Sequence, residues 1–215
     1  MTERLRPGLI AFAFLMALAA CETTEEKAEK RYQEAVQLIA AGEAERGMVA
    51  LRNVFRLNGE HRDARMLYAE QMQEDGNTEQ AFRHYRLVAE QYPNDIEARL
   101  ALARMGSELG TWDIVRDQVE AATEIDANDT RIAPLRVSVE YADALGADDV
   151  LAQEAATTAA AGLLATHPDD KLLHSIVIDG LTRQQRFSSA LDATDRALDA
   201  HPDDPQLNQT KLNIL

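Results

Sequence analysis

A 34-residue spacing of turn residues is the feature that most limits how this chain can fold. Gly42, Gly76 and Gly110 follow one another at intervals of 34 residues. The motif HPDD at 167–170 returns 34 residues later at 201–204. A period of this length fits a helix of about 12 residues, a turn, a second helix and a closing loop, and each such pair buries its apolar face only by stacking on the next pair. The spacing therefore predicts an all-α solenoid of helical hairpins.

Small residues and prolines also recur at set places within this period. The segment 62–95 carries Gly76 in the turn, Ala81 in the second helix and Pro93 at the end. This pattern resembles the tetratricopeptide repeat (TPR). The resemblance implies a right-handed α-solenoid over residues 28–215, with about five hairpins and a terminal helix. The implied units are 28–61, 62–95, 96–129, 130–170 and 171–204, with a partial sixth unit from 205.

Two of these units depart from the pattern at their turns. Unit 171–204 has Gln185 where the family's turn glycine belongs. Unit 130–170 is seven residues longer than the others, which corresponds to about two helical turns. We expect these residues to lengthen its second helix, over the alanine-rich segment 150–168, and we expect Gly146 to form its hairpin turn.

The N-terminal segment has the composition of an export signal. A basic start precedes an apolar run from Leu9 to Ala19. The run is too short to cross a bilayer as a stable helix, which needs about 20 apolar residues. Its length and the small residues at its end are typical of a secretory signal peptide.

This run ends in the sequence LAAC at 18–21, and Cys21 is the only cysteine in the chain. The sequence resembles the bacterial lipobox, in which the cysteine sulfur is acylated and the peptide bond before it is cut. The resemblance implies a lipoprotein signal peptide over 1–20 and a lipidated tether over 21–27. Because Glu22 is not the aspartate that tends to retain enteric lipoproteins in the inner membrane, the implied location is the outer membrane, facing the periplasm. The alternative is an ordinary small-residue cleavage site that happens to precede a cysteine.

The charge of the chain excludes one broad class of partner. The sequence holds 37 acidic and 22 basic residues, which gives a formal net charge of −15. Such a surface repels phosphate backbones, whereas nucleic-acid binders carry clustered lysine and arginine. We therefore expect no nucleic-acid partner. A single cysteine also forms no intramolecular disulfide, so the domain depends on its packing.

No catalytic or metal-binding motif accompanies the repeats. The sequence contains no GxSxG, Walker loop, HExxH or CxxC pattern. The two HPDD motifs fall at loops between repeats, where the proline ends one helix and an aspartate caps the next. Trp112 begins a second helix, where we expect its side chain to pack into the core; the alternative is that it stacks on a ligand. We expect no catalytic residue, no metal and no cofactor, and hence a protein that is not an enzyme.

The TPR resemblance assigns function to the concave groove that the first helices of the hairpins form. That groove suits an extended or helical peptide better than a small anionic substrate. Carried onto this sequence, the family's groove positions in three units are Asp63, Met66, Glu70, Glu97, Leu100, Arg104, Arg136 and Glu140.

A further resemblance concerns residues 50–71, which are similar to a segment of long envelope TPR lipoproteins of the PrsT type. It implies a lipid-anchored periplasmic scaffold that binds protein partners in an envelope assembly, secretion or exopolysaccharide-export system. Three alternatives stay open. The first is a periplasmic carrier or enzyme accessory with a small-molecule site, and the second is a pilus-assembly lipoprotein of the Flp/Tad type. The third is a purely structural spacer, which needs no groove specificity.

The end of the chain is rich in large aliphatic residues. The helix predicted from 205 contains Leu207, Leu212, Ile214 and Leu215. An uncapped apolar face would be exposed to water, so this pattern predicts further repeats or self-association at this end. The alternative is that Leu207 and Ile214 pack back on unit 171–204.

Overall fold

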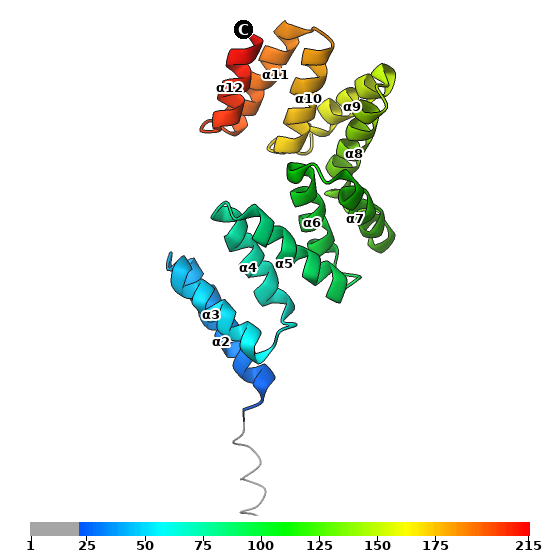
Figure 1. The fold of residues 1–215 in the computed structure, drawn as a ribbon. Helices are drawn as coiled ribbons and strands as arrows, with labels where there is room; N and C mark the ends of the chain where they lie inside the picture. Colours follow the sequence, from blue (N-terminus) through cyan, green and yellow to red (C-terminus); the bar gives the residue numbers. More distant parts are fainter. Residues whose placement is uncertain (1–21) are drawn as a thin grey trace, which may run out of the picture. The chain divides into compact units, whose positions relative to one another are not determined.

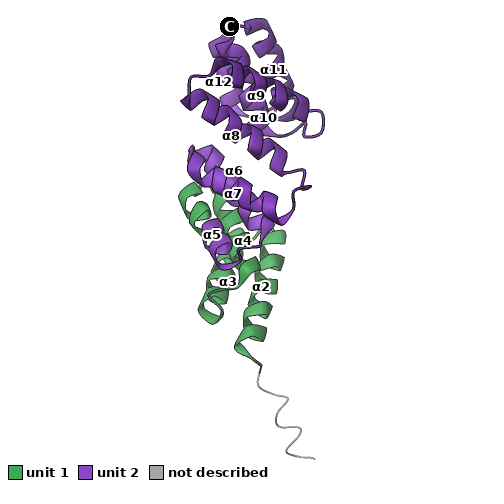
Figure 2. Ribbon diagram, turned by 90° about the vertical axis from the view of Figure 1, so that its right-hand side faces the viewer, with its two compact units in different colours: residues 1–84 green, residues 85–215 purple. Residues whose placement is uncertain are grey.

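The computed structural model describes residues 22–215, so the signal peptide and the lipidation expected at Cys21 lie outside the described residues. The described part forms eleven helices, α2 to α12, and contains no strand (Figure 1). The prediction of an all-α fold of successive helical hairpins is confirmed. The chain divides into two compact units, the first ending at His84 and the second running from Tyr85 to Leu215 (Figure 2).

The first unit contains three complete helices and the start of a fourth. Helices α2 (Thr24–Ala40) and α3 (Ala44–Leu57) form a hairpin, and α3 also contacts α4 (Arg62–Glu74). Helix α5 (Thr78–Gln91) begins in this unit and passes the boundary at His84. Ala81 on α5 is fully buried, as the family pattern predicts for a small residue where helices cross.

The second unit contains the remaining hairpins. Its helices are α6 (Ile96–Leu109), α7 (Trp112–Ile125), α8 (Ile132–Gly146), α9 (Val150–Leu163), α10 (Lys171–Arg183), α11 (Phe187–Ala200) and α12 (Pro205–Ile214). Contacts join α6 to α7, α8 to α9 and α10 to α11 as hairpins, and the first helices α6, α8 and α10 also contact one another in series. This arrangement places the first helices on one face of the unit.

The hairpin turns confirm the 34-residue period. Gly42, Gly76 and Gly110 have φ values of +79°, +75° and +69°, a left-handed conformation that costs glycine nothing. Gln185 has φ +58° at the equivalent place in the last hairpin. The backbone therefore makes the same turn in this hairpin although the side chain there is not glycine.

Gln185→Gly is expected to raise the free energy of unfolding by about 0.5 to 1 kcal/mol, because the left-handed conformation strains a residue with a Cβ atom. Chemical denaturation of the two proteins measures the difference. The neighbour Gln184 has φ −74°, so Gln184→Gly is the matched control and should lower stability. A Gln185→Gly protein that is less stable than the parent would contradict the strain at this turn.

The longer fourth hairpin differs from the sequence prediction in two respects. Gly146 is the last residue of α8 and not the turn; the left-handed residue is Asp148, with φ +53°. Helix α9 has 14 residues, as α5 and α7 do, so the second helix is not lengthened. The extra residues lie in the loop 126–131, in the 15-residue helix α8 and in the loop 164–170. Loops absorb insertions without disturbing a buried helical face, whereas a longer helix would extend beyond its neighbours.

The aspartates of both HPDD motifs are helix N-caps. Asp170 Oδ1 accepts hydrogen bonds from the backbone N–H groups of Leu172 (3.0 Å) and Leu173 (3.2 Å). Asp204 Oδ1 accepts from those of Gln206 (2.9 Å) and Leu207 (3.1 Å), and Pro205 takes the first helical position. The helix-boundary interpretation of these motifs is confirmed.

The last helix packs back on the hairpin before it. Leu207 and Ile214 are partly buried against the core cluster of α8 to α11, whereas Leu212 and Leu215 are 67% and 81% exposed. The packing interpretation of Leu207 and Ile214 is thus the one that the structure bears out. The two exposed leucines leave self-association at this face as a proposal.

His84 belongs to an aromatic cluster in the first unit. Its ring lies 4.7 Å from that of Tyr68 and 5.9 Å from that of Phe55, centroid to centroid. Burial lowers the pKa of His84 to about 4, and the charges of Arg65 and Arg83 act in the same direction. The ring is therefore neutral in the folded protein near neutral pH.

This lowered pKa predicts a specific loss of stability in acid. Between about pH 6.5 and pH 4 the unfolded chain binds a proton at His84 that the folded chain does not, so the free energy of unfolding falls as the pH falls through this window. His84→Phe keeps the ring contacts and removes the titration. Denaturation at pH 7 and pH 4.5 should show a smaller acid loss for this variant, and equal losses in the two proteins would contradict the shift.

Candidate functional site

The first helices of the first unit form a groove between α2 and α4, with a cavity of about 380 Å³. We call it the α2–α4 groove. All three groove residues that the sequence predicts on α4 line this cavity, namely Asp63, Met66 and Glu70. The lining also includes Tyr32, Val36, Ile39, Ala40, Arg62 and Leu67.

The α2–α4 groove combines an apolar wall with acidic groups. Arg62 Nη1 donates to Asp63 Oδ1 at 2.7 Å. Burial raises the pKa of Glu70, the negative charge of Glu74 raises it further, and Arg62 opposes both effects. Burial also raises the pKa of Tyr32, with Asp63 among the carboxylates that add to the shift. This groove can therefore accept hydrogen-bond donors and cations on its α4 side.

A larger cavity, of about 730 Å³, lies in the second unit. We call it the α6–α12 groove, because its lining comes from the first helices α6, α8 and α10, from the start of α12 and from Trp112 at the start of α7. The lining residues are Arg104, Ser107, Glu108, Trp112, Ser138, Tyr141, Ala142, Leu145, Lys171, Leu172, Ser175, Ile176, Asp179, Asp204 and Gln206. Cavities of this size hold either a peptide side chain with its neighbours or a small molecule.

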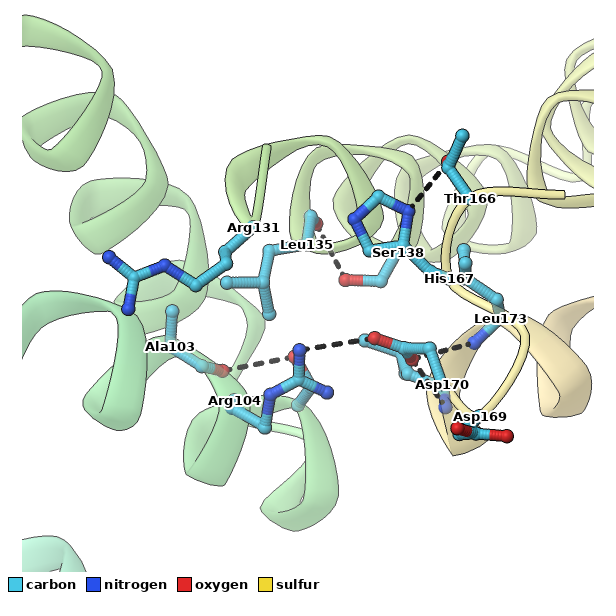
Figure 3. A network of polar contacts seen from close by, with 12 residues as sticks. Ala103, Arg104, Arg131, Leu135, Ser138, Thr166, His167, Asp169, Asp170 and Leu173 are labelled. Carbon is cyan, nitrogen blue, oxygen red and sulfur yellow. Dashed lines mark hydrogen bonds and ion pairs between the residues drawn. The ribbon is translucent and has the colours of Figure 1, made fainter. Parts of the chain in front are cut away.

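Arg104, which lines the α6–α12 groove, forms an ion pair with a residue that is far away in the sequence. Arg104 Nη2 on α6 donates to Asp170 Oδ2 at the start of α10 over 3.1 Å (Figure 3). The side chain of Asp170 is only 8% exposed, and its other oxygen caps α10. One carboxylate therefore both starts a helix and positions the guanidinium of Arg104.

A second set of polar contacts in the α6–α12 groove centres on Asp179. The hydroxyl of Tyr141 donates to Asp179 Oδ2 at 2.6 Å, and Arg183 Nε donates to the same oxygen at 2.7 Å. Burial raises the pKa of Tyr141, and the hydrogen bond to Asp179 raises it further. At the α12 side, Lys171 Nζ donates to Asp204 Oδ2 at 2.8 Å and lowers the pKa of that carboxyl. These pairs keep the polar walls in place before any partner binds.

The three groove residues that the sequence predicts on α6 have different surroundings in the structure. Arg104 lines the α6–α12 groove. Leu100 is buried in the core cluster shared with α7 and α8. The carboxylate of Glu97 accepts hydrogen bonds from Nη1 and Nη2 of Arg131, at 2.7 and 2.8 Å. Of this set, only Arg104 faces the cavity.

The predicted α8 residues lie two positions away from the lining. Arg136 donates to Thr123 Oγ1 at 3.2 Å and Glu140 is exposed, but neither lines the cavity. Their places are taken by Ser138 and Ala142. The cause is the turn: counted back from Asp148, these two residues occupy the positions that Met66 and Glu70 occupy relative to Gly76. Placing the turn at Gly146 shifted the alignment by two residues.

Trp112 is predicted to pack in the core, and it does so only in part. It packs against the core cluster of α6 to α8 while it also lines the α6–α12 groove. Tyr141, Lys171 and Asp179 were not predicted as groove residues. If the repeat positions had been numbered from the left-handed residues Asp148 and Gln185, they would have indicated the faces of α8 and α10 on which these three residues lie.

Other kinds of site are not found in the part of the chain that the structure describes. No group of three or more histidine, cysteine or acidic side chains there could hold a metal ion. None of the described helices is both long and apolar enough to cross a membrane.

Comparison with known proteins identifies the repeat and the fold. Residues 62–105 match the family model of the tetratricopeptide repeat. Among solved structures, a thermophilic TPR protein of Thermus thermophilus is 17% identical, with a TM-score of 0.57 over 87% of this chain and 98% of that one. A TPR protein of Parabacteroides merdae is 13% identical, with a TM-score of 0.66 over 87% and 70%.

A third similar structure is YrrB, a TPR protein with an unusual peptide-binding site. It is 15% identical, with a TM-score of 0.56 over 89% of this chain and 98% of that one. At these identities the likeness shows a shared fold. No curated protein matches the chain.

Proposed function

We propose that this chain, which contains a tetratricopeptide repeat and has the fold of TPR proteins, is a non-catalytic scaffold that holds protein partners in its concave grooves. The observation that carries the proposal is the α6–α12 groove: a preformed cavity on the first helices, with ordered ion pairs and an apolar wall. The α2–α4 groove is a second, smaller site of the same kind.

The lining of the α6–α12 groove suits a peptide segment. Trp112, Leu172 and Ile176 offer apolar surface, while Ser175 offers a hydroxyl group for a peptide backbone. The hydroxyl of Ser107 donates to Ala103 O at 3.0 Å and offers an acceptor oxygen. Peptide recognition needs this combination, because anchor side chains supply affinity and polar groups set orientation. The solved structure of YrrB, with its unusual peptide-binding site on a similar fold, is consistent with this assignment.

We place the scaffold in the cell envelope, lipid-anchored through Cys21 and facing the periplasm from the outer membrane. The lipobox-like sequence at 18–21 supports the anchor. The partners would then belong to an envelope assembly, secretion or exopolysaccharide-export system. A pilus-assembly lipoprotein of the Flp/Tad type is the alternative within the same architecture, and self-association through Leu212 and Leu215 would add a second copy of the chain as a partner.

Cys21→Ser is expected to release the protein from the membrane and leave it folded, because acylation requires the cysteine sulfur. Fractionation of cells that express the full chain, with a salt wash of the membranes, measures the distribution. The parent protein should stay in the pellet, while the variant should move to the soluble fraction or keep its signal peptide. A correctly processed Ser variant that still pellets would contradict lipid anchoring.

Site-specific photo-crosslinking tests the scaffold itself. A photoreactive amino acid replaces Ser175, which is exposed in the α6–α12 groove, and in a control protein it replaces Ser188, which is exposed on α11 outside the groove. In cells of the source organism, protein adducts should form at position 175 and not at position 188.

The small-molecule carrier remains the second candidate because a cavity of about 730 Å³ also has the size of a ligand site. It predicts no protein adduct at position 175. It also predicts a sugar, lipid or metabolite that co-purifies with the parent protein. These two results together would contradict the scaffold function and support the carrier function.

A further inference from the structure

More carboxylates than cations line the α6–α12 groove. Its two lining cations, Arg104 and Lys171, are each already held by a carboxylate, Asp170 and Asp204 respectively. Asp179 is held in turn by Tyr141 and Arg183. An anionic partner would have to compete with these carboxylates for the cations of the groove.

One lining carboxylate differs from the others. Among the residues that the structure describes, none makes a hydrogen bond or an ion pair with Glu108. Arg104 and Lys171 are nevertheless near enough for their positive charges to lower its pKa. Partial burial raises the pKa of Glu108 against the opposing effect of these two cations. Glu108 is an exposed carboxylate that lines the cavity without a direct partner, so a cation that binds there can form a charged hydrogen bond with it and displace no existing pair.

Apolar surface lies in the same cavity. Trp112 is partly buried and lines this cavity, and Leu172 and Ile176 contribute aliphatic side chains from α10. A lysine or arginine side chain suits such a lining, because its methylene stem packs on apolar groups while its charged end reaches a carboxylate. An indole face also attracts cations directly.

We propose that the α6–α12 groove binds a basic segment of a partner protein, with a lysine or arginine side chain on Glu108 and its stem against Trp112. The proposal rests on the proposed scaffold function and adds the chemistry of its partner. The chain's net charge of −15 acts in the same direction, because it attracts a basic segment from a distance and repels an acidic one.

Trp112 allows a direct test because it is the only tryptophan of the chain and lines the groove. A displayed library of random peptides is selected on the purified, signal-free protein, and selected peptides are synthesised. Lysine and arginine should be enriched among them. Titration with these peptides should change the Trp112 fluorescence, and added salt should weaken the binding.

Two charge-neutralising variants locate the contact. Glu108→Gln should weaken binding of the basic peptides by about tenfold or more, since it removes a charged hydrogen bond. Glu124→Gln is the matched control, because Glu124 is exposed on α7 and does not line the cavity. It should leave the affinity within about twofold, the small long-range effect of one surface charge.

The possible results separate this proposal from the scaffold function. Selection of acidic or uncharged peptides, basic peptides that leave Trp112 unchanged, or equal effects of Glu108→Gln and Glu124→Gln would each overturn the proposal. If protein adducts still form at position 175, the scaffold function stands without its basic partner. If basic peptides bind at Glu108 but no protein adduct forms in cells, the results would support the proposed chemistry of the groove and contradict the scaffold function.

Discussion

Gly180→Ala is expected to lower the free energy of unfolding by about 2 kcal/mol, although alanine is the better helix former. Gly180 lies in α10 where this helix crosses α9, and a Cβ atom added there would lie 2.0 Å from Thr157 Oγ1 and 2.9 Å from Thr157 Cβ. Rotation of the threonine side chain moves Oγ1 but leaves Cβ in place. The helices must therefore separate, and overpacking of this kind costs more than the gain in helix propensity.

Two further variants check the cause of that loss. Gly162 lies near the end of α9 with no atom within 4 Å of an added Cβ, so Gly162→Ala should raise stability by about 0.5 to 1 kcal/mol. Adding Thr157→Ala to Gly180→Ala removes the two nearest atoms and should recover part of the loss. Denaturant titration measures all three proteins. If Gly180→Ala and Gly162→Ala change stability equally, the close approach of α9 and α10 is not what limits position 180.

Ala190→Leu is expected to lower the free energy of unfolding by about 1 to 3 kcal/mol, and Ala81→Leu by a similar amount. Both alanines have no exposed surface, and each lies in the second helix of its hairpin. Ala190 belongs to the core cluster of α8 to α11, so three extra carbon atoms would force α10 and α11 apart. Thermal and chemical denaturation should both show the loss.

Ala161→Leu provides the control for these substitutions, because Ala161 is exposed on α9 and a larger side chain there extends into water. Its stability should stay within about 0.5 kcal/mol of the parent protein. If the melting temperatures of Ala81→Leu and Ala190→Leu match that of Ala161→Leu, then the assignment of the small-residue positions in these two units is wrong.

The sequence pattern was sufficient where a structural requirement is local. The left-handed turns could be predicted at Gly42, Gly76 and Gly110, because few residues other than glycine adopt positive φ readily. The N-caps at Asp170 and Asp204 could be predicted too, because an aspartate before a helix satisfies backbone N–H groups a few residues away.

The sequence was not sufficient where the local signal is absent or misleading. Asp148 adopts the left-handed turn two residues after a glycine that the turn does not use, so Gly146 misplaced both the turn and the groove residues of α8. Aspartate tolerates this conformation at modest cost, and packing of α8 on α6 and α10 outweighs it. The position of the turn therefore depends on which face of α8 is buried, and the packing of the neighbouring helices decides which face that is.

The sequence by itself determined the helical hairpins, the glycine turns at 42, 76 and 110 and the aspartate N-caps at 170 and 204, because each of these depends on residues that are close together in the chain. Only the tertiary structure decided which side chains share the α6–α12 groove. Arg104 and Asp170 are 66 residues apart, and Tyr141 and Asp179 are 38 apart. Their meeting depends on how α6, α8 and α10 pack, and a change of two residues in one turn exchanges the side chains that face the cavity.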